Sequence, residues 1–143
     1  EGKLDGLAVE TKILPHDNVG GKKRGLVRAY QVHLDGMTFL HLGDVGAPPD
    51  HVELGEREPV SVLFVPVGGV FTVGPEGAAE WVEAIDPDVA VPMHYRVGGL
   101  SLSIRPVDEF LSLISRPILR LGQAVSFQPK DLEGQHNVWV FSF

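Results

Sequence analysis

The sequence predicts an α/β fold in which a mixed β-sheet is flanked by helices. Two early segments, 6–14 and 26–34, alternate apolar and polar residues, as strands with one exposed face do. Two later segments, Val60–Pro66 and Val89–Met93, are almost continuously apolar, which is typical of strands covered on both faces. Apolar residues at helical spacing follow each of these later strands. This alternation favours parallel strands joined by helical crossovers.

The composition excludes several classes of protein. The 143 residues include no cysteine, so no disulfide forms and any metal must be bound by His, Asp or Glu. The net charge of −7 argues against nucleic acid or an anionic membrane as the main partner. No apolar run approaches the roughly 18 residues of a membrane span, and no signal-peptide pattern opens the chain. The lack of cysteine fits the cytosol, and we expect a cytoplasmic protein.

The first part of the chain predicts three strands joined by tight connections. The strand Gly6–Leu14 leads into a glycine-rich segment, and the next strand covers Leu26–Leu34. Asp35 and Gly36 then separate this strand from Met37–Leu42, and Asp-Gly between apolar runs is a strong hairpin signal. A polar, proline-rich stretch with about one helical turn follows at 47–59.

The segment Gly20–Arg24, with the glycine after it, is a basic loop in an acidic protein. One interpretation is a substrate loop that contacts an anion, in a small phosphoester-binding domain. The other is a solvated connection, and we favour it here because charge runs in loops are usually solvated.

The second part predicts two helices and two closing strands. The first helix begins near Pro75, carries Trp81 on its apolar stripe and ends at Asp86. The second begins at Pro106 and carries Phe110 on a stripe that reaches Ile114. We expect both aromatic side chains to lie in the core. The closing strands are predicted at 119–127 and 137–143, around a loop at 129–136, so that residues 1–143 form a single unit.

The strand directions predict that His16, Asp44 and His94 gather at one edge of the sheet. Each follows the end of a predicted strand, and these strands should run in the same direction. Ligands of open α/β sheets bind beyond the carboxyl ends of the strands. Two imidazoles and a carboxylate are typical of zinc or manganese ligation. Each residue also has an ordinary interpretation, because Asp44 suits a turn and the histidines suit a loop or a strand end.

The other histidines are weaker candidates. His41 lies three residues before Asp44 and is expected to support it. His33 falls on the polar face of its strand, and His51 and His136 lie in polar segments that we expect to be solvated.

Two stretches of sequence resemble a known family. FLHLGDVG at 39–46 and LFVPVGGVFTVGPEGAAEWVEAIDPDVAVPMHY at 63–95 combine a GD pair, a P-x-GG-x-F-T-x-G-P-E run and a P-M-H-Y end. This combination resembles the metal-dependent hydrolases of the metallo-β-lactamase superfamily, in the branch of ascorbate-6-phosphate lactonase-like proteins. The match extends from about residue 6 to 113, and the tail fits more loosely.

The resemblance implies an αββα sandwich with a site for two divalent metal ions, usually zinc and sometimes manganese or iron. By position, Asp44 matches the aspartate that bridges the two metals and is the candidate catalytic residue. His94 matches a ligand of the second metal, and His16 a ligand of the first. In sites of this family a metal-bound hydroxide attacks a carbonyl or phosphoryl centre, and the resemblance implies the same chemistry here on a small-molecule substrate. Nothing in the sequence identifies the substrate-binding residues.

The principal motif of the family, H-x-H-x-D-H, does not occur in these 143 residues. The chain also begins with Glu1 rather than methionine, so we expect it to be a processed product or a segment, matching the C-terminal half of the αββα fold. One hypothesis is a hydrolase of ester, lactone or phosphoester bonds that is active only with the N-terminal half.

The alternative hypothesis is a non-catalytic half-fold that has lost the metal site and serves association. In both cases we expect a partner or an oligomer to cover an apolar face of the first strands. The partner would be the N-terminal half of the fold, a second chain carrying that half, or a second copy of this chain.

Overall fold

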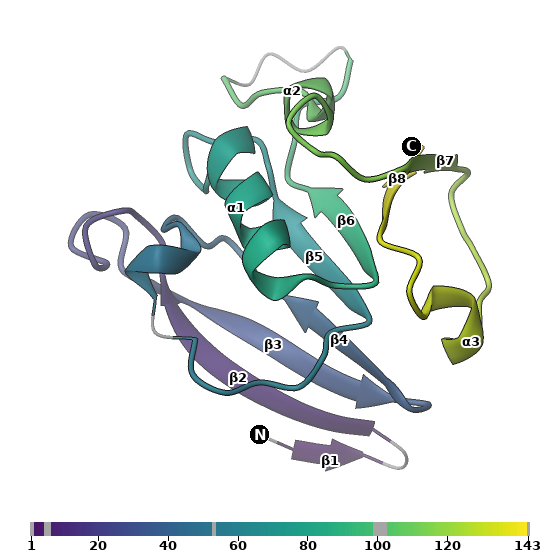
Figure 1. Ribbon diagram of the computed structural model, residues 1–143. Helices are drawn as coiled ribbons and strands as arrows, with labels where there is room; N and C mark the ends of the chain where they lie inside the picture. The colour runs from purple at the N-terminus through teal and green to yellow at the C-terminus, as the bar shows by residue number, and fades with distance from the viewer. Residues whose placement is uncertain (1, 5–6, 53, 99–102, 143) are drawn as a thin grey trace.

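The computed structural model describes residues 2–4, 7–52, 54–98 and 103–142, and only the backbone of 2–4. Within these ranges the strands form one eight-stranded sheet in the order β1-β2-β3-β4-β5-β6-β8-β7 (Figure 1). The predicted α/β class, with a mixed sheet and flanking helices, is confirmed. The strands are β1 Gly2–Leu4, β2 Leu7–Pro15, β3 Leu26–Leu34, β4 Met37–His41, β5 Val62–Pro66, β6 Val89–Met93, β7 Ile118–Leu121 and β8 Asn137–Phe141. The helices are the 3₁₀ turn η1 Pro49–His51, α1 Pro75–Ile85, α2 Val107–Leu111 and α3 Pro129–Leu132.

The turn at Asp35 and Gly36 sets the antiparallel half of the sheet. Both residues have positive φ, 51° and 75°, as a two-residue type I′ hairpin requires. The hairpin pairs Leu34 with Met37, and β3 in turn pairs antiparallel with β2. The predicted hairpin is therefore confirmed, and β2 and β4 run in the same direction.

The second half of the sheet is parallel. β4 pairs parallel with β5, β5 with β6, β6 with β8, and β8 with β7. Because β2 has the direction of β4, the carboxyl ends of β2, β4, β5 and β6 all lie at one edge, here called the rim. The predicted common strand direction is confirmed.

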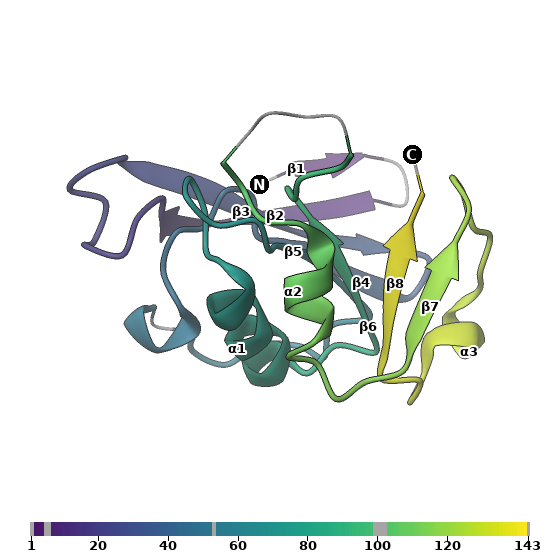
Figure 2. The same ribbon diagram turned by 90° about the horizontal axis from the view of Figure 1, so that it is seen from above.

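One face of the sheet is covered by α1 and α2, and it holds the larger core (Figure 2). Trp81 on α1 is 1% exposed and Phe110 on α2 is fully buried, which confirms both as core residues. The indole Nε1 of Trp81 donates a hydrogen bond to the carbonyl of Ala47 at 2.8 Å. The helix therefore also fixes the segment that follows β4.

The opposite face is covered over only part of its area. A second core lies on this face and includes Met37 of β4, Val91 of β6 and Trp139 of β8. Phe127, in the segment between β7 and α3, packs on it, and the centre of its ring lies 5.3 Å from that of Trp139. Over β2 and β3 the same face is open. Ile13 is 48% exposed there, and Tyr30 and Leu34 are also exposed.

Several predicted boundaries are wrong. The strand predicted at 119–127 ends at Leu121, because its partner β8 pairs only with 118–121 and the chain then turns to lay Phe127 over the second core. The predicted loop at 129–136 begins with the helix α3, which starts at a proline and has a capping box between Gln128 and Asp131. The helix from Pro106 stops at Leu111, short of Ile114. Strand β1 was not predicted, and the predicted strand ends Gly6 and Phe143 lie outside the described residues.

None of the helices in the described ranges is long and apolar enough to cross a membrane.

Replacing Trp81 by alanine should lower the free energy of unfolding by about 3–5 kcal/mol, because it leaves a cavity beneath α1. Trp81→Phe retains most of the packing and loses the hydrogen bond to Ala47, so a loss of about 1 kcal/mol is expected. Urea denaturation measures both. Phe71→Ala is the matched control, because Phe71 is exposed. Equal losses for Trp81→Ala and Phe71→Ala would contradict the assignment of Trp81 as a core anchor.

Candidate metal centre

The three predicted ligands lie in the segments that leave the rim. His16 directly follows β2, Asp44 follows β4 after two intervening residues, and His94 directly follows β6. The backbone N–H of His16 donates to the carbonyl of Gly25 at 3.0 Å, so the two ends of the loop between β2 and β3 are tied together. The positions of all three residues follow from the strand order and direction.

His16 and Asp44 lie side by side. The Nε2 atom of His16 is 3.8 Å from the Oδ2 atom of Asp44, and their side chains are 21% and 51% exposed. This separation is too long for a direct hydrogen bond. Two donors bound to one zinc at about 2 Å each lie about 3–4 Å apart, so the separation suits a shared cation. The other ring nitrogen of His16, Nδ1, is buried and finds no hydrogen-bond partner within the described part of the chain.

Two glycines allow the rim segments to pack this closely. A Cβ on Gly46 would lie 2.3 Å from the carbonyl carbon of His16, and the N–H of Gly46 donates to Pro15 at 2.9 Å. A Cβ on Gly68 would lie 2.2 Å from the carbonyl oxygen of His94. The glycines of the GDVG and P-x-GG motifs therefore bring the loops after β4 and β5 against those after β2 and β6.

His94 is not brought into a group with the other two residues. Across the ranges described, no group of three or more His, Cys, Asp or Glu side chains is placed to hold a metal ion. Strand β5 lies between β4 and β6, and two strand spacings of about 4.8 Å separate their ends. His94 is exposed and has a positive φ of 54°. Its role as a ligand stays a prediction.

His41 lies close enough to Asp44 to feel its charge. Burial lowers the pKa of His41, while the negative charge of Asp44 raises it, and the net shift is downward. The Nδ1 atom of His41 accepts a hydrogen bond from the N–H of Gly43 at 3.1 Å, which requires that nitrogen to be unprotonated. His41 is thus held neutral beside Asp44.

Two of the remaining histidines make specific contacts. His33 Nδ1 lies 3.4 Å from a carboxylate oxygen of Glu58, and His136 Nδ1 lies 3.4 Å from one of Asp86. His136 is half exposed but paired, so solvation alone does not describe it. His51 is exposed in η1.

Asp17 organises the loop between β2 and β3, and sequence reasoning missed it. Asp17 is 4% exposed, and its carboxylate accepts backbone hydrogen bonds at 2.8–2.9 Å from residues 19, 21, 23 and 24. Burial alone would raise the pKa of Asp17, but these four N–H groups stabilise the carboxylate and hold the pKa well below its ordinary value. The signal was an aspartate just before a glycine-rich turn, where Asp side chains bind following backbone N–H groups.

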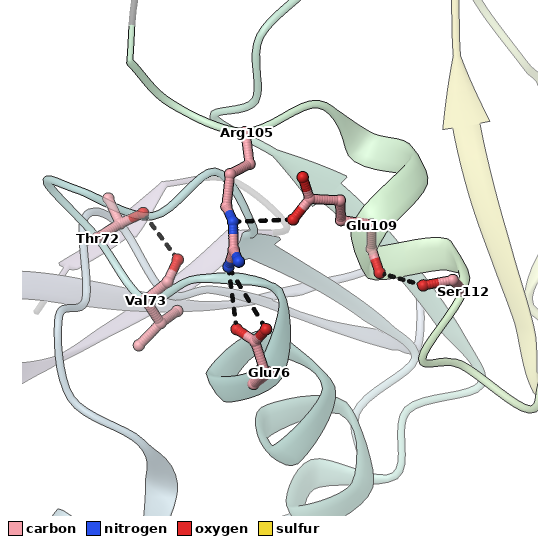
Figure 3. Close-up of polar contacts among 6 residues, drawn as sticks. All are labelled: Thr72, Val73, Glu76, Arg105, Glu109 and Ser112. Atoms are coloured by element: carbon pink, nitrogen blue, oxygen red, sulfur yellow. Dashed lines mark hydrogen bonds and ion pairs between the residues drawn. The ribbon is translucent and has the colours of Figure 1, made fainter.

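Arg105 connects the loops that follow β5 and β6 to the helices α1 and α2. Figure 3 shows its side chain between Glu76 and Glu109. Its guanidinium contacts Glu109 at 2.8 Å and Glu76 at 3.2 Å, in α2 and in the first turn of α1. Its backbone N–H donates to Gly68 at 2.7 Å, and its carbonyl accepts from the N–H of Arg96 at 3.0 Å. The loops after β5 and β6 are therefore fixed to the helices α1 and α2.

Comparison with known proteins identifies the family. Residues 1–94 match the sequence profile of the Beta-lactamase superfamily domain. The chain belongs to the metallo-β-lactamase superfamily. A solved structure from Thermotoga maritima, described among Zn-dependent hydrolases of this superfamily, has a TM-score of 0.73 and 30% identity, covering 96% of this chain and 66% of that one. A metal-dependent hydrolase from Parabacteroides distasonis, at 14% identity, shares the fold with a TM-score of 0.61.

Curated relatives carry the description UPF0173 metal-dependent hydrolase. One from Staphylococcus epidermidis is 32% identical over 124 residues, which cover 84% of this chain and 53% of the relative. One from Thermococcus kodakarensis is 45% identical over 67 residues, covering 46% of this chain and 30% of the relative. The chain spans about half the length, or less, of these curated relatives.

Replacing Asp17 by asparagine should destabilise the fold at neutral pH, because one amide oxygen cannot accept four N–H groups and the amide NH₂ opposes two of them. The pKa of Asp17 is lowered by folding, so its contribution is complete above the unfolded-state pKa of about 3.9. That contribution is lost as the pH falls below this value toward the folded pKa. The difference in melting temperature between wild type and Asp17→Asn should therefore shrink below about pH 4.

Thermal unfolding followed by circular dichroism between pH 3 and 7 measures this difference. Asp50→Asn, at an exposed aspartate of η1, removes the same charge and should change the melting temperature little. A difference that stays constant through acid pH would show that the hydrogen-bonded carboxylate of Asp17 does not contribute as described.

Proposed function

We propose that this chain is the C-terminal part of a metal-dependent hydrolase that cleaves an ester, lactone or phosphoester bond in a small-molecule substrate. The observation that carries the proposal is the contact of His16 with Asp44, 3.8 Å apart, at the rim of a metallo-β-lactamase-type sheet. The descriptions of the relatives as metal-dependent hydrolases support it. The GD and P-M-H-Y motifs support a place in the ascorbate-6-phosphate lactonase-like branch.

The imidazole and carboxylate groups of this chain are suitable ligands for a divalent metal ion, but in the described residues fewer than three of them lie together. His16 and Asp44 would hold one ion, and Asp44 and His94 a second. Imidazole and carboxylate suit zinc, which we propose as the metal, with manganese or iron as alternatives. A catalytic zinc usually has three protein ligands and a water. Each ion would therefore need further ligands from outside this chain, and we propose that the N-terminal half of the fold, or a second chain carrying it, brings them.

A bound divalent ion would act at this site as a Lewis acid that lowers the pKa of a water molecule. The residues of this chain position that chemistry. Asp44 is half exposed, so a small substrate can approach it, and its carboxylate is the proposed catalytic group. The neutral His41 adds no competing positive charge beside it. The net charge of −7 and the lack of cysteine support a cytoplasmic enzyme that does not bind nucleic acid or membrane.

A second candidate is a non-catalytic half-fold that serves association. Two observations favour it: the open apolar face around Ile13 and Tyr30, and the lack of any three-donor group in the described residues. The two candidates differ in whether metal binding accompanies assembly, because ligands that meet only in the assembled fold couple metal binding to folding.

The chain alone should bind less than one zinc per molecule and hydrolyse no lactone or phosphodiester. With the segment that encodes H-x-H-x-D-H co-expressed, it should bind about two zinc ions. His16→Ala and Asp44→Asn should then each lower zinc affinity by at least about tenfold. Metal content by mass spectrometry and competition with a chelator measure this, with His51→Ala as a control. Full zinc occupancy in both site variants would contradict the assigned ligands, and full activity of the chain alone would contradict the need for a partner.

The open face of β2 and β3 should cause this chain to associate when it is expressed alone. Ile13→Glu places a charge in that face and should shift the chain toward monomer, because the charge would be desolvated in the contact. Leu113→Glu alters a similarly exposed leucine next to α2 and should leave association unchanged. Sedimentation velocity at micromolar concentration separates the species. A wild-type chain that is fully monomeric would show that this face needs no cover.

A further inference from the structure

The loop between β2 and β3 is fixed in place. The carboxylate of Asp17 binds the N–H groups of Val19, Gly21, Lys23 and Arg24, and the N–H of Gly25 donates to Gly21 at 2.9 Å. A loop with this many internal bonds presents its side chains in defined directions. The segment predicted to be a solvated connection is largely exposed, and its internal hydrogen bonds also give it a defined structure; we call it the basic loop (residues 17–25).

The basic loop displays three cations whose charge is not neutralised. Lys22, Lys23 and Arg24 are exposed, and in the described ranges none of their charged groups lies within ion-pair distance of a carboxylate. Elsewhere in the molecule, Arg105 and Arg116 are paired with carboxylates. The loop is therefore a local positive region on a protein of net charge −7.

The basic loop begins and ends next to His16 of the candidate metal centre. Asp17 directly follows His16, and Gly25 accepts the backbone hydrogen bond of His16. Figure 1 shows the loop at the end of β2 from which His16 leaves the sheet. A molecule whose anionic group is held by the loop could therefore extend to the rim.

An exposed apolar segment faces the basic loop. The guanidinium of Arg24 lies 5.6 Å from the centre of the Phe71 ring, in the segment between β5 and α1. The preceding Val70 is 49% exposed and has a φ of 64°. This conformation is costly for a β-branched residue, and such strain gathers at functional sites. The two segments together offer positive charge and apolar surface.

We propose that the basic loop binds a phosphoryl group of the substrate, while Val70 and Phe71 contact its less polar part. The inference rests on the proposed hydrolase function and specifies its substrate class. Several clustered cations favour a dianion over a monoanion, because the attraction grows with the charge of the ligand. The negative charge of the rest of the protein disfavours anions elsewhere on its surface. The loop then orients a phosphorylated substrate so that another part of it meets the rim.

Titration with inorganic phosphate tests the proposal on this chain, followed by ¹H–¹⁵N NMR in the presence of EDTA. Saturable shifts are expected at the amides of residues 19–24, with weaker binding of acetate. Lys22→Gln and Lys23→Gln should each weaken phosphate binding by about two- to fivefold, the effect of an exposed ion pair. Lys130→Gln makes the same change in net charge on α3 and should leave the affinity unchanged.

The proposal is overturned if phosphate shifts are absent or scattered, or if Lys130→Gln weakens binding as much as the loop variants. Tighter binding of a single-stranded oligonucleotide than of phosphate at these amides would also overturn it, in favour of nucleic acid. The chelator separates this result from the metal-site test. Phosphate binding without zinc binding in the assembled protein contradicts the hydrolase function alone, and zinc binding without phosphate binding contradicts the loop assignment alone.

Discussion

The turn at Asp35 and Gly36 is the constraint on which the rim depends. Its positive φ angles fix the pairing of Leu34 with Met37, and a shift of one residue would exchange the two faces of β4. The turn also gives β4 the direction of β2, so that both strands leave the sheet at the same edge. The parallel strands β5 and β6 extend the same edge, because the crossover through α1 returns the chain in the same direction. The contact of His16 with Asp44 is a consequence of this topology.

Close backbone packing then converts a shared edge into a site. Gly46 and Gly68 lie where any Cβ would overlap the backbone of His16 or His94. Arg105 fixes the loops after β5 and β6 from the helical side, and Asp17 fixes the loop after β2 from within. A buried carboxylate is costly unless hydrogen bonds stabilise its charge, and the four N–H groups around Asp17 do so. The rim is therefore ordered by this chain alone, before any metal or partner is considered.

The parts predicted from the sequence are those set by local pattern. The apolar run at Val60–Pro66, the helical stripe of Trp81 and the Asp-Gly turn each depend on neighbouring residues, and each was found. The segment 119–127 alternates like a strand, yet its aromatic end packs on Trp139. Whether residues 122–127 continue the strand pairing with β8 or turn to pack on Trp139 depends on the tertiary fold, which the local pattern does not report. The glycine-rich context of Asp17 is a signal for a side chain that binds backbone N–H groups. The neighbouring lysines and arginine favoured a solvated loop, and they carry no information about Asp17. The spacing of His94 from Asp44 depends on the strand inserted between them, which no local pattern reports.

The unpartnered Nδ1 of His16 shows that the donor set at the rim is incomplete within the described residues. A buried imidazole nitrogen without a hydrogen bond costs about 1–3 kcal/mol, and metal-ligating histidines almost always bond through their second nitrogen to a carboxylate, a carbonyl or water. Within the described ranges no such partner lies at Nδ1, while Nε2 faces Asp44. The orientation is the one a ligand would need, and the missing bond lies on the buried side of the ring. A bond to Nδ1 would give His16 the support that ligating histidines have at their second nitrogen, so metal affinity should rise when that bond is made.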